Sequence, residues 1–342
     1  MADTRNILIV APAWVGDAVL AQPLFRRLHE LHSGLMLDVL APPWTLPVFA
    51  RMPEVRATIA APFRHGELAL GKRRALGREL AEKNYDQAIV LPNSFKSALA
   101  PWFAGIPLRT GFVGELRQLL LNDARRLDDK TLLQMAEQFA ALAEPPGVPL
   151  QRPLAPPHLV ADEARRAATL AKLGLDTARP VVALCPGAEY GPAKRWPPQY
   201  FAELARRLAA QGHAVWIIGS KNDAAIGAEI ARHSGGAGID LCGRTTLDEA
   251  IDLLSCAALV ISNDSGLMHV AAALGKPLLA LYGSSSPAFT PPLSDAAQIL
   301  RLDLPCSPCF RRVCPLGHFN CMMKMTPDHV WRQIDFAKIR VS

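Results

Sequence analysis

The sequence predicts an α/β protein made of two doubly wound halves, and three observations lead to this prediction. Short apolar runs alternate with segments of helical periodicity along most of the chain, as is typical of parallel sheets that helices cover on both faces. The 342 residues are enough for about two domains. A proline-rich stretch over residues 144–157 interrupts the alternation, and two halves joined there would enclose a cleft.

The first half begins with an apolar run, Asn6 to Ala11, that predicts a strand. Asp17 to His32 follows, with apolar residues at the spacing of a helix. The alternation then continues. Strands are expected at 35–41, 57–61, 87–91 and 107–112, and helices at 44–51, 67–83 and 95–103.

The second half repeats the alternation more clearly. Thr246 and Glu249 have the spacing of a helix capping box. Strands are expected at 181–185, 214–218, 239–242, 259–261 and 278–281, and helices at 161–173, 197–211, 223–233, 246–256 and 267–274. We therefore expect one domain at 1–157, a second at 158–325, and a C-terminal segment at 326–342.

Composition favours a globular protein with anionic partners, since 50% of the residues are hydrophobic and the net charge is +6. Much of the excess positive charge lies in residues 64–83, which form either a solvated helix face or a surface that meets an anionic membrane. No basic patch is interleaved with aromatic residues, so we expect no nucleic-acid partner. Because no apolar run resembles a membrane span or a signal peptide, we expect a cytoplasmic protein.

Polar residues follow two predicted strands of the first half, at the edge where open α/β sheets bind ligands. Asp17 follows the first strand without the glycine fingerprint of a dinucleotide site. It is either the N-cap of the next helix or a carboxylate that takes a proton from a hydroxyl group. Asn93, Ser94 and Lys96 follow a later strand, where they form either a helix cap with a surface lysine or a site for an anionic acceptor.

Three loops of the second half have the composition of a phosphate site. Residues 186–197 combine small residues such as Gly187 with the positive charges of Lys194 and Arg195. This combination suits a diphosphate, and we favour that interpretation over an ordinary polar loop. A serine-rich loop after a later strand contains Ser284, which offers a backbone N–H group to the same anion.

The third loop opens a short helix, whose free N–H groups and dipole favour a bound anion. Its polar and small residues are Asp264, Ser265, Gly266 and His269. A lone histidine is more often structural than catalytic, so His269 is interpreted as a structural residue or as a hydrogen-bond partner of a phosphate or sugar.

Four of the seven cysteines form a cluster near the C-terminus: Cys306, Cys309, Cys314 and Cys321. The spacing is compatible with zinc, and His318 lies within it. However, the second pair is not a C-x2-C knuckle, and a cytosolic chain has no need of disulfides. We therefore expect reduced structural thiols and no metal, with a bound metal as the alternative.

Four segments together resemble the heptosyltransferases of lipopolysaccharide inner-core synthesis, glycosyltransferase family 9, and above all those that add the second heptose. They are Ala11 to Asp17, Leu91 to Ser97, Ser262 to His269 and Cys306 to Met323. The resemblance covers nearly the whole chain. It implies a GT-B fold, in which two Rossmann-like domains face each other across a cleft. The last helix of such a chain often packs back on the first domain, and the resemblance implies that Pro327 to Lys338 is this helix.

The resemblance also implies an activity: transfer of L-glycero-D-manno-heptose from ADP-L-glycero-D-manno-heptose to the first heptose of a lipid A–Kdo–heptose acceptor. The reaction would invert the anomeric carbon, use no metal or other cofactor, and take place in peripheral contact with the cytoplasmic face of the inner membrane. The first domain would bind the acceptor, and the second would bind the donor.

The matching positions carry the family's roles. Asp17 becomes the general base, and Lys194 holds the donor diphosphate and offsets charge on the leaving group. Gly187, Asp264, Ser265, Gly266, His269 and Ser284 line the donor pocket, and Asn93, Ser94 and Lys96 lie on the acceptor side. The alternatives are another member of the family, such as heptosyltransferase I or III, and a non-catalytic protein that binds a nucleotide sugar.

Overall fold

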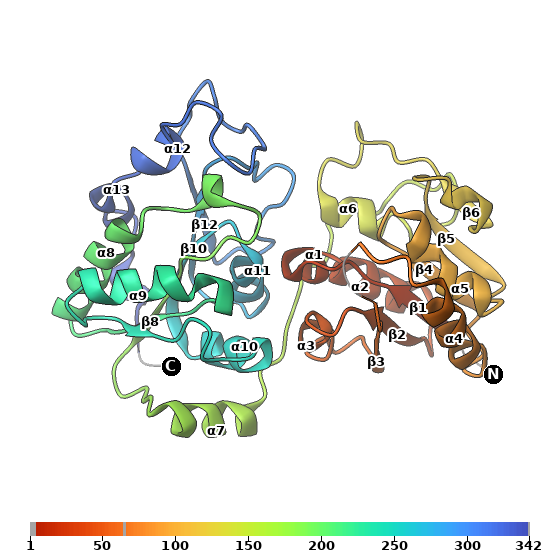
Figure 1. Cartoon of the computed structure of the whole chain (residues 1–342), viewed down its shortest axis with the longest axis horizontal. Coiled ribbons are helices and arrows are strands. Elements are labelled where there is room, and N and C mark those ends of the chain that lie inside the picture. The colour runs from red at the N-terminus through yellow and green to blue at the C-terminus, as the bar shows by residue number, and fades with distance from the viewer. Residues whose placement is uncertain (1–4, 64–65, 341–342) are drawn as a thin grey trace. The chain divides into compact units, whose positions relative to one another are not determined.

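The computed structural model describes residues 5–63 and 66–340, and the chain divides into two compact units, Met1–Pro157 and His158–Ser342 (Figure 1). The division falls at the end of the proline-rich stretch. Each unit contains one six-stranded sheet, and every strand pair in both sheets is parallel.

The first sheet has the strand order β3-β2-β1-β4-β5-β6. Its strands are β1 (Asn6–Val10), β2 (Met36–Ala41), β3 (Ala57–Ala60), β4 (Gln87–Val90), β5 (Leu108–Phe112) and β6 (Asp123–Arg125). The helices of this unit are α1 (Val15–Leu20), α2 (Gln22–Leu31), α3 (Leu46–Phe49), α4 (Leu70–Ala81), α5 (Leu99–Phe103) and α6 (Met135–Ala140), with 3-10 turns η1 (Phe95–Ala98) and η2 (Arg117–Leu119). Helix α4 packs against α5, and α2 packs against α6 (Figure 1).

The second sheet has the order β12-β11-β10-β7-β8-β9. Its strands are β7 (Val181–Cys185), β8 (Ala214–Ile217), β9 (Ile239–Asp240), β10 (Ala257–Asn263), β11 (Leu278–Tyr282) and β12 (Ala297–Arg301). The helices are α7 (Glu163–Leu173), α8 (Pro198–Ala210), α9 (Ala224–His233), α10 (Leu247–Ser255), α11 (Gly266–Ala273), α12 (Asn320–Met323) and α13 (Pro327–Trp331), with turns η3 (Pro192–Lys194), η4 (Lys221–Asp223) and η5 (Phe336–Lys338).

Both sheets follow the doubly wound order in which the first strand of the unit lies beside the fourth. In the first unit these strands are β1 and β4, and in the second they are β7 and β10. Successive strands wind in opposite directions from this point, which leaves a crevice at the carboxyl ends of the two strands. The loops that follow β1, β4, β7 and β10 are therefore the expected binding loops of the two units.

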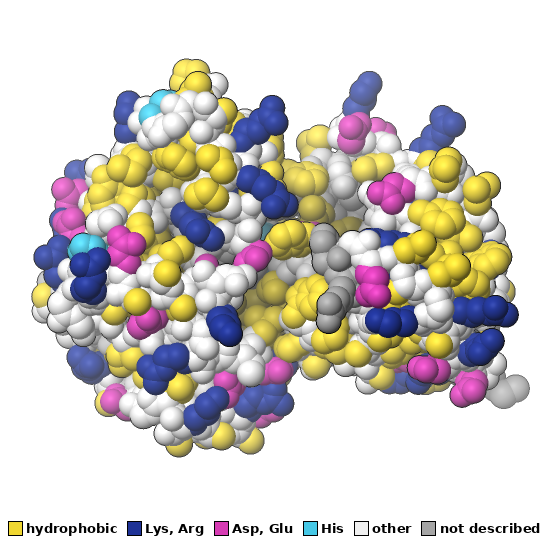
Figure 2. All heavy atoms as spheres, viewed as in Figure 1, with side chains coloured by type: hydrophobic (Ala, Val, Ile, Leu, Met, Phe, Trp, Pro, Cys, Tyr) yellow, Lys and Arg dark blue, Asp and Glu magenta, His cyan; other side chains and the backbone are white. Residues whose placement is uncertain are grey.

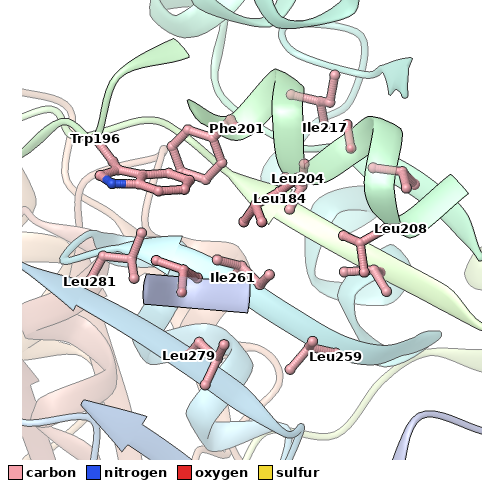
Figure 3. Close-up of a cluster of buried hydrophobic side chains, with 14 of the residues drawn as sticks. Leu184, Trp196, Phe201, Leu204, Leu208, Ile217, Leu259, Ile261, Leu279 and Leu281 are labelled. Carbon is pink, nitrogen blue, oxygen red and sulfur yellow. The ribbon is translucent and has the colours of Figure 1, made fainter. Parts of the chain in front are cut away.

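Apolar side chains bury both faces of the central strands, as parallel sheets require. In the second unit, Leu184, Ile217 and Ile261 of neighbouring strands pack with Leu204 and other residues of α8 (Figure 3). Burial of each such side chain contributes about 1.5–3 kcal/mol. This core fixes the strand ends from which the binding loops emerge.

One predicted helix of the first unit is divided in the structure. The expected helix from Asp17 to His32 breaks between α1 and α2, because Pro23 has no N–H group and its ring excludes a continuous helix through Ala21. The predicted pattern also lacked β6, α6 and β12. The strands β6 and β12 lie at the sheet edges, where exposed residues replace the continuous apolar run of a central strand.

The C-terminal segment also differs from its prediction. Helix α13 ends at Trp331, and a separate turn begins where the Asp335 carboxylate accepts a hydrogen bond from the N–H of Ala337. Val330, Ile334 and Ile339 belong to the hydrophobic core of the second unit. Residues 341–342 and Arg64, at the start of the basic stretch, lie outside the described residues.

Candidate active site at the two sheet switch points

The site in the second unit is centred on the buried carboxylate of Asp264, which side chains from two other loops bind. Asp264 follows β10, and its Oδ2 atom lies 2.5 Å from Nζ of Lys194, which is in the loop after β7. The hydroxyl of Ser285, in the loop after β11, donates a hydrogen bond to the same Oδ2 atom. Three loops of the second sheet therefore converge on one carboxylate.

The loop that carries Lys194 is fixed to the end of β10 by the fully buried Asn263. Its amide Oδ1 accepts a hydrogen bond from the backbone N–H of Trp196 at 3.1 Å, and its Nδ2 donates to the carbonyl of Pro186 at 2.7 Å. Lys194 also lies over the ring of Tyr190, 5.1 Å from the ring centre. The position of the ammonium group is thus set by its surroundings as well as by its ion pair.

Gly187 allows the same loop to pass close to the next loop of the sheet. A Cβ atom at this position would lie 2.5 Å from Oδ2 of Asp223. That carboxylate is held by the N–H and hydroxyl groups of Ser220, at 2.9 and 2.7 Å. A side chain at position 187 would therefore displace a buried hydrogen-bonding group.

His269 is the fourth residue of α11, and its side chain is buried. Burial lowers the pKa of its imidazole to about 4, while smaller effects of Asp264 and Lys194 raise and lower it. The ring is therefore neutral near pH 7 and is able to take part in hydrogen bonds without carrying charge. At the start of α11, Ser265 and Gly266 lie where the helix offers N–H groups to an anion.

Ser284 lies at a separate small cavity. Its hydroxyl is buried and has no hydrogen-bond partner among the described residues. The residues around this cavity include Ala193, Ser284, Cys306, Cys309, Cys314, His318 and Cys321. The structure thus gathers the four clustered cysteines, all as free thiols, next to the loop of Lys194.

A metal at this cluster has no support in the arrangement of its side chains. In the part of the chain that the structure describes, no group of three or more His, Cys, Asp or Glu residues is arranged to hold a metal ion. His318 accepts a hydrogen bond at Nδ1 from the N–H of Asn320, at 3.0 Å. The absence of a metal remains a prediction, and its test is a metal analysis.

In the first unit, Asp17 is in the first turn of α1, two residues after the helix begins at Val15. The helix N-cap is Trp14, so the interpretation of Asp17 as the N-cap is wrong. The carboxylate nevertheless lies in the first turn of the helix, near the positive end of its dipole. Its side chain is half-buried, at the carboxyl end of β1.

The loop with Asn93, Ser94 and Lys96 follows β4, the strand next to β1. Asn93 is held by the fully buried Arg117, whose Nη2 atom donates to the amide Oδ1 at 2.9 Å. Val10 and Val90 are paired in the register of the sheet, so this loop and the loop before Asp17 leave the sheet side by side.

The structure thus places the predicted residues in two sets. Asp17 and the loop of Asn93 lie at the switch point of the first sheet, and Lys194 and Asp264 at that of the second. Sequence reasoning did not select Ser285 or Asn263. The serine run after β11 was noticed, but nothing in it distinguished the hydroxyl that binds Asp264 from that of Ser284.

A family model described as glycosyltransferase family 9 (heptosyltransferase) matches residues 73–320. The chain belongs to glycosyltransferase family 9. It is 44% identical to lipopolysaccharide heptosyltransferase 2 of Escherichia coli K12, over 96% of this chain and 97% of that protein. It is 46% identical to lipooligosaccharide heptosyltransferase 2 of Haemophilus influenzae, over 87% of this chain and 88% of that protein.

The fold agrees with this membership. The solved structure of ADP-heptose lipopolysaccharide heptosyltransferase II from Escherichia coli matches with a TM-score of 0.87 and 42% identity, and the match covers 98% of each chain. The predicted family, the GT-B fold class with two Rossmann-like domains, and the prediction of a glycosyltransferase are confirmed. The roles of the individual residues in this family 9 enzyme remain predictions.

Proposed function

We propose that this glycosyltransferase transfers L-glycero-D-manno-heptose from ADP-heptose to the first heptose of the lipid A–Kdo–heptose acceptor. The 44% identity to lipopolysaccharide heptosyltransferase 2 over 96% of the chain supports this substrate pair. The structural observation that carries the proposal is the Lys194–Asp264 pair at the switch point of the second sheet. A positive charge and a carboxylate at that point suit a diphosphate joined to a polyhydroxylated sugar.

In this proposal the second unit binds the donor. Lys194 and the N–H groups at the start of α11 bind the diphosphate, and Asp264 accepts hydrogen bonds from hydroxyl groups of the heptose. As the bond between the anomeric carbon and the phosphate oxygen breaks, negative charge grows on the departing ADP. The Lys194 ammonium offsets that charge, so the reaction needs no divalent metal or other cofactor.

The first unit binds the acceptor, with Asn93, Ser94 and Lys96 on the acceptor side. Asp17 accepts the proton of the acceptor hydroxyl as its oxygen attacks the anomeric carbon. The new glycosidic bond forms on the side opposite the departing ADP, so the configuration of that carbon inverts. The products are the elongated acceptor, ADP, and a protonated Asp17 that returns its proton to water.

The reaction also requires contact with a membrane surface, because lipid A anchors the acceptor. Among the described residues, no helix combines the length and the apolar composition of a membrane span. We place the enzyme on the cytoplasmic face of the inner membrane as a peripheral protein.

The test is transfer from ADP-heptose to defined acceptors, with the products identified by mass spectrometry. We expect one heptose to be added to lipid A–Kdo–heptose and none to lipid A–Kdo. Transfer to lipid A–Kdo alone would indicate a heptosyltransferase I activity. Binding of ADP-heptose without transfer to any core acceptor would indicate a non-catalytic sugar-nucleotide protein, and either result would overturn the proposal.

A further inference from the structure

Two buried arginines fasten neighbouring segments to the loop that carries Asn93, Ser94 and Lys96. Arg117 donates from Nη1 to the carbonyl of Pro92 and from Nη2 to Oδ1 of Asn93. Arg73, from α4, donates from Nη1 to the carbonyl of Lys96 at 2.8 Å. Both guanidinium groups therefore hold this loop by hydrogen bonds.

Each arginine also shapes the segment from which it comes. Arg73 donates from Nε to the carbonyl of Leu68 at 2.6 Å, which fixes the approach to α4. Arg117 donates from Nε to the carbonyl of Phe112 at 2.6 Å, which closes the turn before η2. Burial of a guanidinium group costs free energy unless its N–H groups bind acceptors. These hydrogen bonds must therefore be kept, and they restrict the shape of the two segments closely.

These fixed segments expose leucines. Leu116 and Leu119 are 66% and 74% exposed, and Leu68 and Leu70 are 53% and 52% exposed. Leu116 moreover has φ of +61° and its neighbour Glu115 has φ of +42°, a left-handed conformation that residues other than glycine seldom adopt. Exposed leucines on segments whose backbone is fixed in this way point to an external contact.

Positive charge accompanies the leucines. Lys72, Arg74 and Arg78 are exposed on α4, which begins at Leu70. Lys72 makes a 3.4 Å ion pair with Glu67, and Glu79 is exposed on the same helix, so the exposed side of α4 keeps an excess of positive charge. The negative charge of Glu115 is engaged locally, because its carboxylate accepts a hydrogen bond from the N–H of Phe95 at 3.1 Å. On the face of the first unit that Figure 2 presents, Lys and Arg side chains are likewise interspersed with hydrophobic ones.

We propose that Leu116 and Leu119, together with Leu68, Leu70 and the basic face of α4, dock the first unit on an anionic lipid surface. Exposed leucines that enter the headgroup boundary, next to lysine and arginine, are the combination that binds proteins to the face of a bilayer. The inference rests on the proposed function, since it explains how the loop beside these leucines reaches a saccharide that is anchored in lipid.

The first test is flotation with vesicles of phosphatidylethanolamine that contain a minor fraction of phosphatidylglycerol. We expect the wild-type chain to bind them and the double variant Leu116→Ser/Leu119→Ser to bind about tenfold more weakly. Leu133→Ser is the matched control, because Leu133 is 63% exposed but lies next to α6, which packs with α1 and α2. It should bind like the wild type.

One further double variant and one further measurement complete this test. Lys72→Glu/Arg74→Glu should weaken binding to the same vesicles. The weaker binding that we expect to vesicles of phosphatidylcholine alone should stay unchanged in this variant. The result does not depend on whether the leucine variant folds well. Equal binding by the wild type and by both double variants would overturn the proposal. So would unchanged vesicle binding by the leucine variant together with the loss of a self-association that the wild type shows in solution, because the surface would then join two copies of the chain.

Activity separates this inference from the proposed function. With a deacylated, water-soluble Kdo–heptose acceptor, the wild type and Leu116→Ser/Leu119→Ser should transfer heptose equally well. With the acceptor embedded in anionic vesicles, the variant should lose about tenfold in kcat/KM relative to the wild type. No transfer by the wild type to either acceptor would contradict the proposed function, whereas equal rates on vesicles would contradict only the docking surface.

Discussion

Lys194 and Ser285 bind the same oxygen of Asp264, so this carboxylate is already oriented before a donor arrives. An ammonium group that is placed in advance loses little freedom when charge develops on a leaving group nearby. The resemblance of the sequence to family 9 selected Lys194 and Asp264. The contact between them depends on the loop fold, and in particular on Asn263, which no sequence pattern singled out.

Replacement of Lys194 tests the source of positive charge in the donor site. We expect Lys194→Gln to lower kcat/KM for ADP-heptose by about 10²–10³, and we expect EDTA to leave the wild-type rate unchanged. Lys172→Gln is the control, because Lys172 makes a 2.7 Å ion pair with Glu249 on the surface of the same unit. Initial rates with and without EDTA, and a metal analysis that finds less than one ion per chain, would support this; a rate that requires Mg²⁺ would contradict it.

The buried imidazole of His269 should make stability depend on pH. Burial lowers the pKa of His269 from 6.5 to about 4, so the unfolded chain binds a proton in this window while the folded chain does not. The contribution to stability is complete above pH 6.5 and falls by up to about 3 kcal/mol as the pH drops to 4. Urea unfolding followed by tryptophan fluorescence should show this slope, and His269→Gln should reduce it.

At the scale of elements, the central strands and their helices were predictable because burial on both faces leaves long apolar runs. The edge strands β6 and β12 were not, since their exposed residues lack that pattern. Local patterns also missed the interruption at Ala21. The proline that causes it was visible, but Pro23 is equally acceptable in the first turn of a new helix.

The approach of one loop to another is an element-scale feature that a single substitution tests. We expect Gly187→Ala to destabilise the chain by about 1–3 kcal/mol and to raise KM for ADP-heptose, because the new Cβ would displace the Asp223 carboxylate. Gly71→Ala is the control: Gly71 is in the first turn of α4, and a Cβ there would meet no atom within 4 Å. Thermal melting and donor titration measure both variants, and equal behaviour of the two would disprove the close-approach argument.

At the scale of the whole molecule, the sequence indicated which polar residues follow strands. It did not predict the order of the strands, which decides which of these residues lie together. Polar loops were recognised after five strands, yet their grouping depends on β1 lying beside β4 and β7 beside β10. Those pairings join strands that are far apart in the sequence, so no local pattern encodes them. The topology is what makes Asp17 and Asn93 one set of residues, and Lys194 and Asp264 another.

Because the proposed base and the donor-binding residues belong to different units, their functions should be separable by mutation. We expect Asp17→Asn to lower kcat by about 10²–10⁴ while the affinity for ADP-heptose stays within twofold, roughly the error of a titration. Lys194→Gln should weaken donor binding itself. Calorimetric titration with ADP-heptose and single-turnover transfer to lipid A–Kdo–heptose measure the two effects independently. If Asp17→Asn instead abolished donor binding, or left turnover intact, Asp17 would not be the base, and the division of labour between the two units would have to be abandoned.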